Sequence, residues 1–307
     1  MSADLSLARD LLRAACGERL RLDVPMAPLT TFRIGGPAAL YLEPNDLHDL
    51  EAAGEAIVRA DIPFAILGKG SNVLVADDGF PGLVLRLGQG FRWSAREGSS
   101  LVAGGAMPLP ALAGVALRHE LAGLEFGVAI PASLGGAVRM NAGAHGGQVS
   151  DVVDAVEVFG LRTGAAATVA AADAGFGYRR STLAEDAVVV AATSVLRPGD
   201  PGEIRAQMDS ARAWRRETQP IAEPNCGSVF TNPPGAHAAA LIEGAGLKGL
   251  AVGGAHVSMK HANFIIAGEG ATAADVLRLI EEIRDRVAES TGTVLEPEVR
   301  SIGGPGA

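Results

Sequence analysis

Short extended runs and helical stretches alternate along the chain without an internal repeat. The runs at 64–67, 82–87 and 187–192, which are apolar apart from Arg86, are typical of buried strands. Asn45-Asp46 precedes a stretch predicted to be helical through Val58, because both side chains can accept hydrogen bonds from the first N–H groups of a helix. Residues 109–120 are predicted to form another helix.

The second half of the chain follows a stretch rich in proline and glycine. Arg197–Gly202 has the composition of a linker between domains, and the polar stretch Glu203–Arg216 is predicted to be helical. Thr272 and Asp275 have the spacing of a capping box. Apolar residues then recur along one helix face, at Val276, Ile280, Ile283 and Val287. Residues 295–300 are expected to be extended, because Pro297 disfavours helix at the preceding residue.

Composition favours one large domain or two ordinary ones. The 307 residues are 48% hydrophobic and 20% charged, which suffices for a sizeable core. Cys16 and Cys226 are too few for a disulfide scaffold or a cysteine-rich metal site. The N-terminus lacks the apolar segment of a signal peptide, and no apolar run approaches membrane-spanning length. A cytoplasmic protein without a membrane partner is expected, and the net charge of −9 disfavours nucleic acid as a partner.

Small residues are concentrated between Gly123 and Gly147. Glycine lets a ligand approach the backbone closely, and successive N–H groups in glycine-rich turns can bind an anion. The alternative is a tightly packed crossing of strand and turn that binds no ligand. This stretch alone does not decide between the two.

A second glycine loop, Leu67–Leu74, follows the predicted strand at 64–67. Its amides and its serine hydroxyl could hold a pyrophosphate, although the loop has neither the P-loop order nor the third glycine of a dinucleotide fingerprint. The string Gly244–Gly249 does match that fingerprint. The residues before it are predicted to be helical rather than extended, with Gly244 as the helix C-cap, which strongly disfavours a Rossmann site.

Polar residues suited to catalysis occur in three places: Tyr178–Ser181, Pro224–Pro233, and Glu298 with Arg300. Ser228 follows a glycine and precedes Val-Phe, so it is expected to start a strand. No Gly-x-Ser-x-Gly surrounds it, and no histidine pair has metal-ligand spacing. Taken singly, an ordinary structural role is favoured for each: a surface ion pair for Arg179, a turn hydroxyl for Ser228 and a solvated carboxylate for Glu298.

Taken in chain order, several short motifs resemble the UDP-N-acetylenolpyruvoylglucosamine reductase (MurB) family. The resemblance covers roughly residues 28–302, and the order of the motifs is more specific than any one of them. Only a short stretch separates Ser181 from the next strand, which is similar to the branch that lacks an inserted tyrosine loop. The motifs are Thr31–Ala38, Gly68–Leu74, Ile130–Gly143, Tyr178-Arg179, Cys226–Pro233, Gly246–Gly249, Lys260–Asn263 and Leu295–Arg300.

The resemblance implies an α+β fold with a vanillyl-alcohol-oxidase-type (PCMH-type) FAD-binding domain of two subdomains and a smaller substrate-binding domain. Residues 1–200, completed by 292–307, would form the FAD-binding region, and 201–291 the substrate domain. FAD, bound non-covalently, would pass hydride from NADPH to the enolpyruvyl ether of a UDP-sugar in peptidoglycan synthesis. A monomer is expected.

The resemblance also assigns roles to residues. Hydride addition to the vinyl carbon leaves an enolate, which a cation and an acid must stabilise. The implied catalytic residues are Arg179, Ser228 as the proton donor, and Glu298. The implied cofactor-binding residues are Gly68, Lys69, Gly70, Ser71, Asn72, Val73, Ile130, Pro131, Ser133, Gly135, Gly136, Asn141, Gly143 and Arg300. The implied substrate-binding residues are Tyr178, Asn232, Lys248, His261 and Asn263, and no metal is implied.

Some positions depart from the family pattern. Ala129 and Ala132 stand where glycine is frequent, and a methyl group there is tolerated only if φ is negative. Thr231 stands where a basic residue is common, and Ala267 where asparagine is frequent. Two alternatives stay open: a flavin oxidase with the same cofactor fold, and a nucleotide-binding module without catalytic activity.

Overall fold

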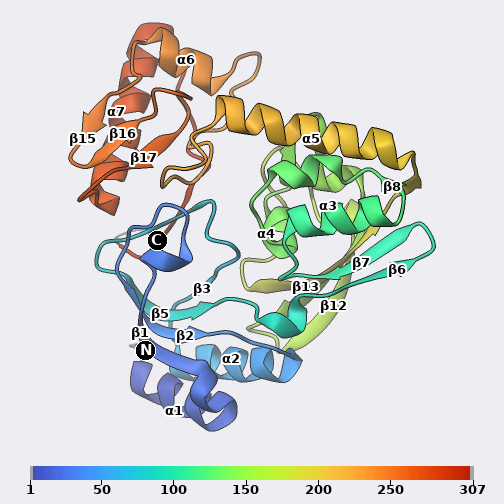
Figure 1. Ribbon diagram of the computed structural model, residues 1–307. Helices are drawn as coiled ribbons and strands as arrows, with labels where there is room; N and C mark the ends of the chain where they lie inside the picture. The colour runs from blue at the N-terminus through green and yellow to red at the C-terminus, as the bar shows by residue number, and fades with distance from the viewer. Residues whose placement is uncertain (1–2, 305–307) are drawn as a thin grey trace. The chain divides into compact units, whose positions relative to one another are not determined.

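The computed structural model describes residues 3–304, and the chain divides into two compact units (Figure 1). The first unit comprises Met1–Leu22, Leu40–Lys69 and Gly82–Trp214, and the second comprises Asp23–Ala39, Gly70–Pro81 and Arg215–Ala307. The last boundary falls inside a helix, Pro201–Thr218, rather than at the expected linker. The assignment of 1–200 with 292–307 to FAD, and of 201–291 to the substrate, stays a prediction.

Helices begin close to where the hydrophobic pattern placed them. Asp46 caps α2, with its Oδ1 accepting the Asp49 N–H at 2.9 Å, and the helix continues past the predicted Val58. The predicted Gly244 C-cap is wrong, because Gly244 is the last helical residue and the left-handed φ falls on Gly246. The helices are α1 (Leu5–Cys16), α2 (Leu47–Ala60), α3 (Leu109–Arg118), α4 (Leu134–Arg139), α5 (Pro201–Thr218), α6 (Ala238–Gly244) and α7 (Ala273–Thr291).

The three predicted strands exist, with shifted ends. The run at 82–87 belongs to a strand that starts at Phe80 and ends at Leu85, and the run at 187–192 continues to Val195. The longer strands are β1 (Leu20–Pro25), β2 (Pro37–Leu42), β3 (Phe64–Ile66), β4 (Val73–Val75), β5 (Phe80–Leu85), β6 (Ser94–Glu97), β7 (Ser100–Gly104), β11 (Val153–Gly160), β12 (Ala165–Ala170), β13 (Ala187–Val195), β16 (Ala255–Val257), β17 (Ile265–Ala267) and β18 (Arg300–Ile302). The two-residue strands are β8 (Leu121–Ala122), β9 (Gly143–Ala144), β10 (Gly147–Gln148), β14 (Arg197–Pro198) and β15 (Ala251–Val252).

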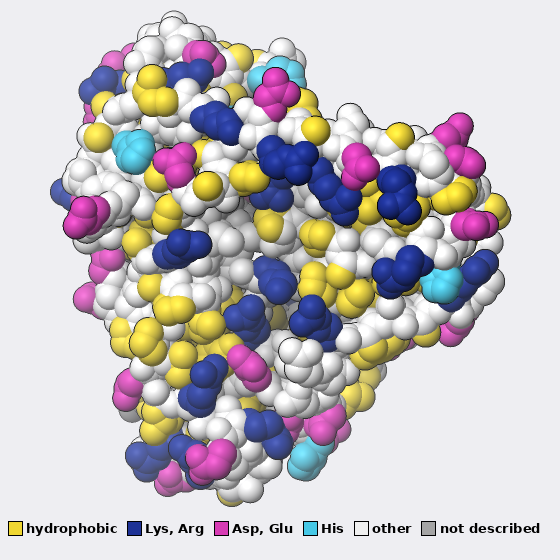
Figure 2. All heavy atoms as spheres, in the orientation of Figure 1, with side chains coloured by type: hydrophobic (Ala, Val, Ile, Leu, Met, Phe, Trp, Pro, Cys, Tyr) yellow, Lys and Arg dark blue, Asp and Glu magenta, His cyan; other side chains and the backbone are white. Residues whose placement is uncertain are grey.

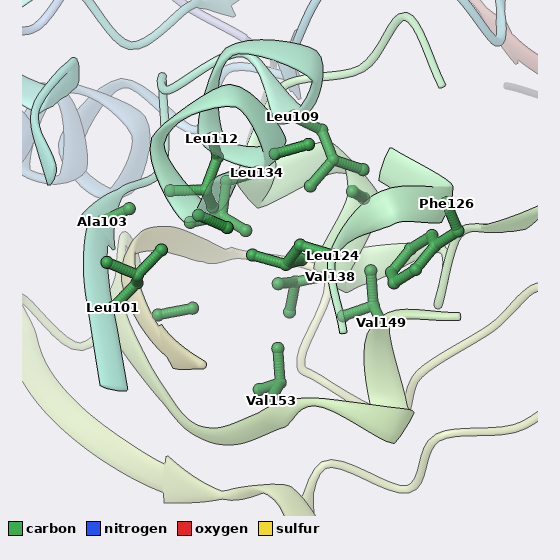
Figure 3. Close-up of a cluster of buried hydrophobic side chains, with 14 of the residues drawn as sticks. Leu101, Ala103, Leu109, Leu112, Leu124, Phe126, Leu134, Val138, Val149 and Val153 are labelled. Carbon is green, nitrogen blue, oxygen red and sulfur yellow. The ribbon is translucent and has the colours of Figure 1, made fainter. Parts of the chain in front are cut away.

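A five-stranded sheet in the order β12-β11-β13-β7-β6 organises much of the first unit. All of its pairings are antiparallel. Helices α3 and α4 bury their leucines and valines in one core with this sheet (Figure 3). Leu109 and Leu112 of α3, Leu134 and Val138 of α4 and Leu101 of β7 meet there.

Strand β13 is buried on both faces, which explains its continuous apolar sequence. Ala187 and Val189 belong to the core under α3 and α4, whereas Val188 and Val190 belong to a second core with α1 and α2. Side chains alternate between the faces of a strand, so one strand supplies both cores. The second core also contains strands of a sheet ordered β1-β2-β5-β3, in which β3 and β5 run parallel.

The second unit has a core of its own, in which helix α7 packs against β15-β16-β17. The predicted capping box of α7 is confirmed: the Thr272 hydroxyl accepts from the Asp275 N–H, and Asp275 accepts from the Thr272 N–H, each at 3.1 Å. Val276, Ile280, Ile283 and Val287 are buried, as predicted. A parallel pair, β4 with β18, joins residues 73–75 to residues 300–302. Within residues 3–304, no helix is long and apolar enough to cross a membrane.

Candidate functional site

A cavity of about 370 Å³ lies in the first unit, at the ends of β3 and β5 and the starts of α4 and β13. Five residues predicted to bind a cofactor line it: Gly68, Lys69, Ser133, Gly135 and Gly136. The two glycine-rich segments, which the sequence showed only as separate loops, therefore meet at one cavity. This meeting favours the ligand-binding interpretation over a packed crossing.

Close packing of the backbone explains why glycine occupies key positions around the cavity. A Cβ atom on Gly105 would lie 2.0 Å from the carbonyl oxygen of Val189, a backbone atom that cannot turn aside. A Cβ atom on Gly68 would lie 2.7 Å from Ser133 Oγ. Gly105 was missed in the sequence, although it belongs to a Gly104-Gly105 pair.

The available backbone N–H groups differ between the two glycine segments. Residues 134–139 form helix α4 instead of an open turn, and the N–H groups of Gly135 and Gly136 donate to Gly105 O (2.9 Å) and Ser133 Oγ (3.3 Å). Among the residues that the structure describes, the N–H groups of Gly68 and Lys69 donate to no acceptor. The loop after β3 is therefore the better backbone donor for an anion.

Cations line the cavity as well. Lys69, Arg86 and Arg92 all contribute to its wall. Partial burial lowers the pKa of Lys69, and the positive charges of Arg86 and Arg92 lower it further, which places the three cations near one another. Arg86 and Arg92 were missed, although they flank a Gly-x-Gly that directly follows a predicted strand.

The remaining charged residues of the wall are engaged elsewhere. Arg139 donates to the backbone carbonyl groups of Leu183, Ala184 and Ala187. Glu43 accepts from the Tyr41 hydroxyl at 2.7 Å and lies 3.4 Å from a guanidinium nitrogen of Arg21. Lysine and arginine side chains are prominent on the face shown in Figure 2, although the chain as a whole is acidic. The cavity is therefore suited to a negatively charged group such as a diphosphate.

Other predicted cofactor residues of the first unit lie outside this cavity wall. Ile130 packs partly buried against the core, and Pro131 is exposed. Asn141 and Gly143 follow α4 and contact the turn that carries Arg179. Ala129 and Ala132 do not have positive φ angles, so the methyl groups at these positions are tolerated.

Arg179 lies at the tip of a tight turn. Gly177 and Arg180 exchange backbone hydrogen bonds of 3.0 and 3.3 Å, which leaves Tyr178 and Arg179 at the tip. The φ angle of Arg179 is 58°, a left-handed conformation that costs a non-glycine residue about 1–2 kcal/mol. Its Nη2 donates to Gly143 O at 2.9 Å, and its Cζ lies 5.0 Å from the centre of the Tyr178 ring. Such strain is concentrated at functional sites.

In the second unit, the predicted residues at the end of the Leu67–Leu74 loop lie at the β4–β18 pair. Gly70 has a φ of 65°, and its carbonyl accepts the Thr31 N–H at 3.0 Å. Asn72 donates through Nδ2 to Glu298 O at 3.1 Å and accepts the Arg300 N–H at 3.1 Å. Val73 pairs with Arg300, while Ser71 lies between Gly70 and Asn72 in the loop. The loop and the C-terminal segment thus form one structural element.

Ser228 and Glu298 belong to adjoining backbone segments of the second unit. The Glu298 N–H donates to Val229 O at 2.7 Å, so the residue after Ser228 is bound directly to Glu298. Ser228 does not start a strand, contrary to the expectation. Phe230 forms an isolated bridge with Pro297, and Gly227, with a φ of 81°, interrupts the extended backbone directly before Ser228. Both Ser228 and Glu298 are half-buried.

Asn263 holds the segment after Ser228 in place. Its Oδ1 accepts the Phe230 N–H at 2.9 Å, its Nδ2 donates to Phe230 O at 2.8 Å, and its own carbonyl accepts from Val229 N–H at 2.9 Å. The side chain is 4% exposed. Its predicted contact with the substrate is untested, and the structure gives it a supporting role for the serine.

The other predicted substrate residues also have protein partners. Lys248 Nζ lies 2.7 Å from Glu243 Oε1, and Asn232 Oδ1 accepts from the Ala238 N–H at 3.0 Å. Burial lowers the pKa of His261, and the charge of Lys248 lowers it further. His261 Nδ1 accepts from the Asn263 N–H at 3.3 Å, which leaves Nε2 as the hydrogen-bond donor of the neutral ring.

The three predicted catalytic residues are divided between the units. Arg179 belongs to the first, and Ser228 and Glu298 to the second, so their convergence on one substrate stays a prediction. Residues 3–304 contain no cluster of His, Cys, Asp and Glu side chains that could hold a metal ion.

Family models match most of the chain. A model described as an FAD binding domain matches residues 38–170. A model described as the C-terminal domain of UDP-N-acetylenolpyruvoylglucosamine reductase matches residues 219–302.

Curated and solved proteins of the same name are similar along nearly the whole chain. The reductase of Anaeromyxobacter sp. is 46% identical over 300 residues, covering 98% of this chain and 93% of its own. The reductase of Heliobacterium modesticaldum is 47% identical over 284 residues, which cover 92% of this chain and 90% of its own. The crystal structure of the reductase of Thermus caldophilus aligns with a TM-score of 0.81 at 36% identity, covering 92% of this chain and 100% of that one.

Proposed function

The chain belongs to the UDP-N-acetylenolpyruvoylglucosamine reductase family, and on that premise we propose that its cation-lined cavity holds the diphosphate part of FAD. The protein is an FAD-dependent oxidoreductase of peptidoglycan precursor synthesis. It reduces the enolpyruvyl group of UDP-N-acetylenolpyruvoylglucosamine, which gives UDP-N-acetylmuramate. The observation that carries the proposal is the meeting of Gly68 and Lys69 with Ser133 and α4 around this cavity.

The residues present fit FAD. The unengaged N–H groups of Gly68 and Lys69, together with the cations of Lys69, Arg86 and Arg92, suit a diphosphate. Neither histidine nor cysteine, the side chains that could form a covalent link to a flavin, is among the residues lining the cavity, and non-covalent binding is proposed on that ground. When bound, FAD supplies the hydride chemistry, accepting hydride from NADPH and delivering it to the enolpyruvyl carbon.

The protein's own residues act on the charge that the substrate develops. As the vinyl carbon is reduced, negative charge builds at the neighbouring carbon and its carboxylate. We assign Arg179 to that carboxylate, because the guanidinium group offers paired N–H donors that match two carboxylate oxygens. Glu298, next to the serine segment, is assigned to the same developing enolate as a hydrogen-bonding acid.

Ser228 is assigned as the donor of the proton that completes the new C–H bond. A serine hydroxyl is a weak acid, so it can serve only a strongly basic carbon in a site that excludes water. Asn263 and Glu298 hold Val229 and Phe230 by hydrogen bonds, and this supports a fixed direction for the Ser228 hydroxyl. The proton returns to Ser228 from solvent after product leaves.

The second unit is proposed to bind the UDP-sugar. Lys248 would have to leave or share its ion pair with Glu243 to reach a diphosphate, and His261 would donate through Nε2 as a neutral ring. Thr231, which replaces a basic residue, is hydrogen-bonded to Glu296. A monomer in the cytoplasm is the proposed state, with UDP-sugar and NADPH as the only partners.

A spectrum and two additions test this function. The purified protein should be yellow, lose its flavin absorbance when NADPH is added without oxygen, and regain it when the enolpyruvyl UDP-sugar follows. A flavin oxidase would instead regain absorbance with oxygen alone at a comparable rate. A nucleotide-binding module without catalytic activity would show no bleaching with NADPH, and either result would contradict the proposal.

A further inference from the structure

Asn141 makes contacts that differ from those expected of a cofactor ligand. Its Oδ1 accepts the Ser150 N–H at 2.9 Å, and its Nδ2 donates to Gly177 O at 3.0 Å and to Gln148 Oε1 at 3.4 Å. The residue is 2% exposed. Every hydrogen-bonding atom of this side chain therefore faces the protein.

The backbone at Asn141 would suit glycine better than asparagine. Asn141 has a φ of 40° where the chain leaves α4, and its N–H donates to Val138 O at 3.1 Å. Glycine adopts this conformation without strain, and asparagine is among the few other residues that tolerate it. The asparagine side chain therefore contributes three hydrogen bonds that glycine lacks, and the bond to Gly177 is the one that reaches the turn carrying Arg179.

Gly177 is the first residue of the turn that presents Arg179. The same short segment holds this turn a second time, because Gly143 O accepts from Arg179 Nη2 at 2.9 Å. Asn141 thus fixes the base of the turn and Gly143 fixes the guanidinium group at its tip. The left-handed φ of Arg179 requires such support, because the turn would otherwise relax.

We propose that Asn141 is a positioning residue for Arg179, acting through the carbonyl group of Gly177 and making no contact with the flavin. The inference rests on the proposed role of Arg179 at the substrate carboxylate. Without the bond to Asn141, the turn shifts and the guanidinium group no longer meets the carboxylate in the correct geometry. A misplacement of about 1 Å near the reacting groups can cost about 100-fold in rate.

Two variants of the FAD-loaded enzyme test the inference. Asn141→Gly keeps the backbone conformation and removes the side chain. Asn141→Asp keeps the shape and the acceptor for Ser150 but cannot donate to Gly177. Both should retain FAD and be reduced by NADPH within about twofold of wild type, while reoxidation by the enolpyruvyl substrate slows by about 10- to 100-fold.

The matched control is Gln148→Ala, which removes the longer bond to Asn141 and leaves the bond to Gly177 intact. Its reoxidation rate should stay within about twofold of wild type, since the Arg179 turn keeps its support. A loss in this variant equal to that in the Asn141 variants would overturn the inference, because the antiparallel pair of β9 and β10, to which Gln148 belongs, would then be responsible as a whole.

A double-mutant cycle separates positioning from general damage. In an Arg179→Ala background, Asn141→Gly should change the reoxidation rate by less than about twofold. If Asn141 acts through the Arg179 guanidinium group, its substitution has little further effect once that group is gone. An additive loss, or loss of FAD from both Asn141 variants, would overturn the inference and favour the cofactor-binding role. Failure of the wild-type enzyme to reduce the enolpyruvyl substrate would instead overturn the proposed function itself.

Discussion

At the scale of single residues, Ser228 is held more firmly than its position in a loop suggests. Gly227, with a φ of 81°, turns the chain before it, and Val229 is bound on both sides, its N–H to Asn263 O and its carbonyl group to the Glu298 N–H. A serine in a mobile loop could not deliver a proton to one carbon. Here the direction of its Cα–Cβ bond is fixed by the neighbouring backbone.

Ser228→Ala should separate the two half-reactions. Flavin reduction by NADPH should stay near the wild-type rate, because it needs no carbon acid. Reoxidation by the enolpyruvyl substrate should slow by about 10²–10⁴-fold, the usual value of general acid catalysis. Stopped-flow absorbance of the flavin measures both rates. Ser228→Cys should keep part of the activity, and small, equal effects of alanine on both rates would contradict the proton-donor role.

The two cysteines should be chemically inert in the folded protein. Burial, followed by the charge of Asp49, raises the pKa of Cys16 to about 11, and burial raises the pKa of Cys226 well above its ordinary value. The reactive thiolate is therefore scarce in either residue up to about pH 10. Maleimide labelling at pH 8 should be slow for native protein and fast in denaturant. Rapid labelling of Cys226 in native protein would show that its segment opens.

At the scale of secondary-structure elements, the strength of the local signal decided what the sequence could predict. Helix α7 was predicted in detail because a capping box and a periodic apolar face coincide there. Helix α4 was missed, since its Leu-Gly-Gly-Ala-Val-Arg sequence has glycine at two of six positions and low helix propensity. It forms because Ser133 caps it and Leu134 and Val138 pack in the core. Two-residue strands such as β9 have no sequence pattern to detect.

Asp77 adds a second cap to α7 from a distant part of the chain. Its carboxylate accepts from the N–H groups of Ala273 at 2.7 Å and Ala274 at 3.0 Å. Asp77→Ala should lower the free energy of unfolding by about 1 kcal/mol, because water replaces the lost acceptor only in part. The thermal midpoint should fall by about 2–4 °C. Asp77→Asn keeps one acceptor oxygen, so its loss of stability should be smaller. An equal loss of stability in both variants would mean that the negative charge of Asp77, rather than its hydrogen bonds, stabilises α7.

At the scale of the whole molecule, the prediction of the site depended on contacts that a sequence does not reveal. The glycine loops were found as motifs, but only the fold brings Gly68 and Ser133 to one cavity. Arg86, Arg92 and Gly105 were missed because their roles follow from strands that meet in space. The resemblance to a family supplied Ser228 and Glu298, whose types alone are common on any surface.

A net charge of −9 opposes binding of the anionic cofactor, so the local cations must dominate. Arg86→Gln and Arg92→Gln should each weaken FAD binding by about 10- to 100-fold, because a charge-assisted hydrogen bond contributes about 1.5–3 kcal/mol. Both substitutions should also make the affinity for FAD less dependent on salt concentration. Arg96→Gln, an exposed change outside the cavity wall, is the matched control. Flavin fluorescence titrations at two ionic strengths measure the affinity for FAD and its salt dependence. An unaltered salt dependence in both variants would argue against a role of Arg86 and Arg92 in binding the diphosphate.

The shared strand β13 has a consequence for how the first unit opens. Because its alternate residues belong to two cores, neither core can loosen without disturbing the other. Amide hydrogens of Val188–Ala192 should therefore exchange with deuterium only through unfolding of the whole unit, at one common free energy. Those of the exposed edge strand β12 should exchange through local fraying, many times faster. Hydrogen–deuterium exchange followed by mass spectrometry would resolve the two strands, and different opening energies on alternate residues of β13 would mean that the cores open separately.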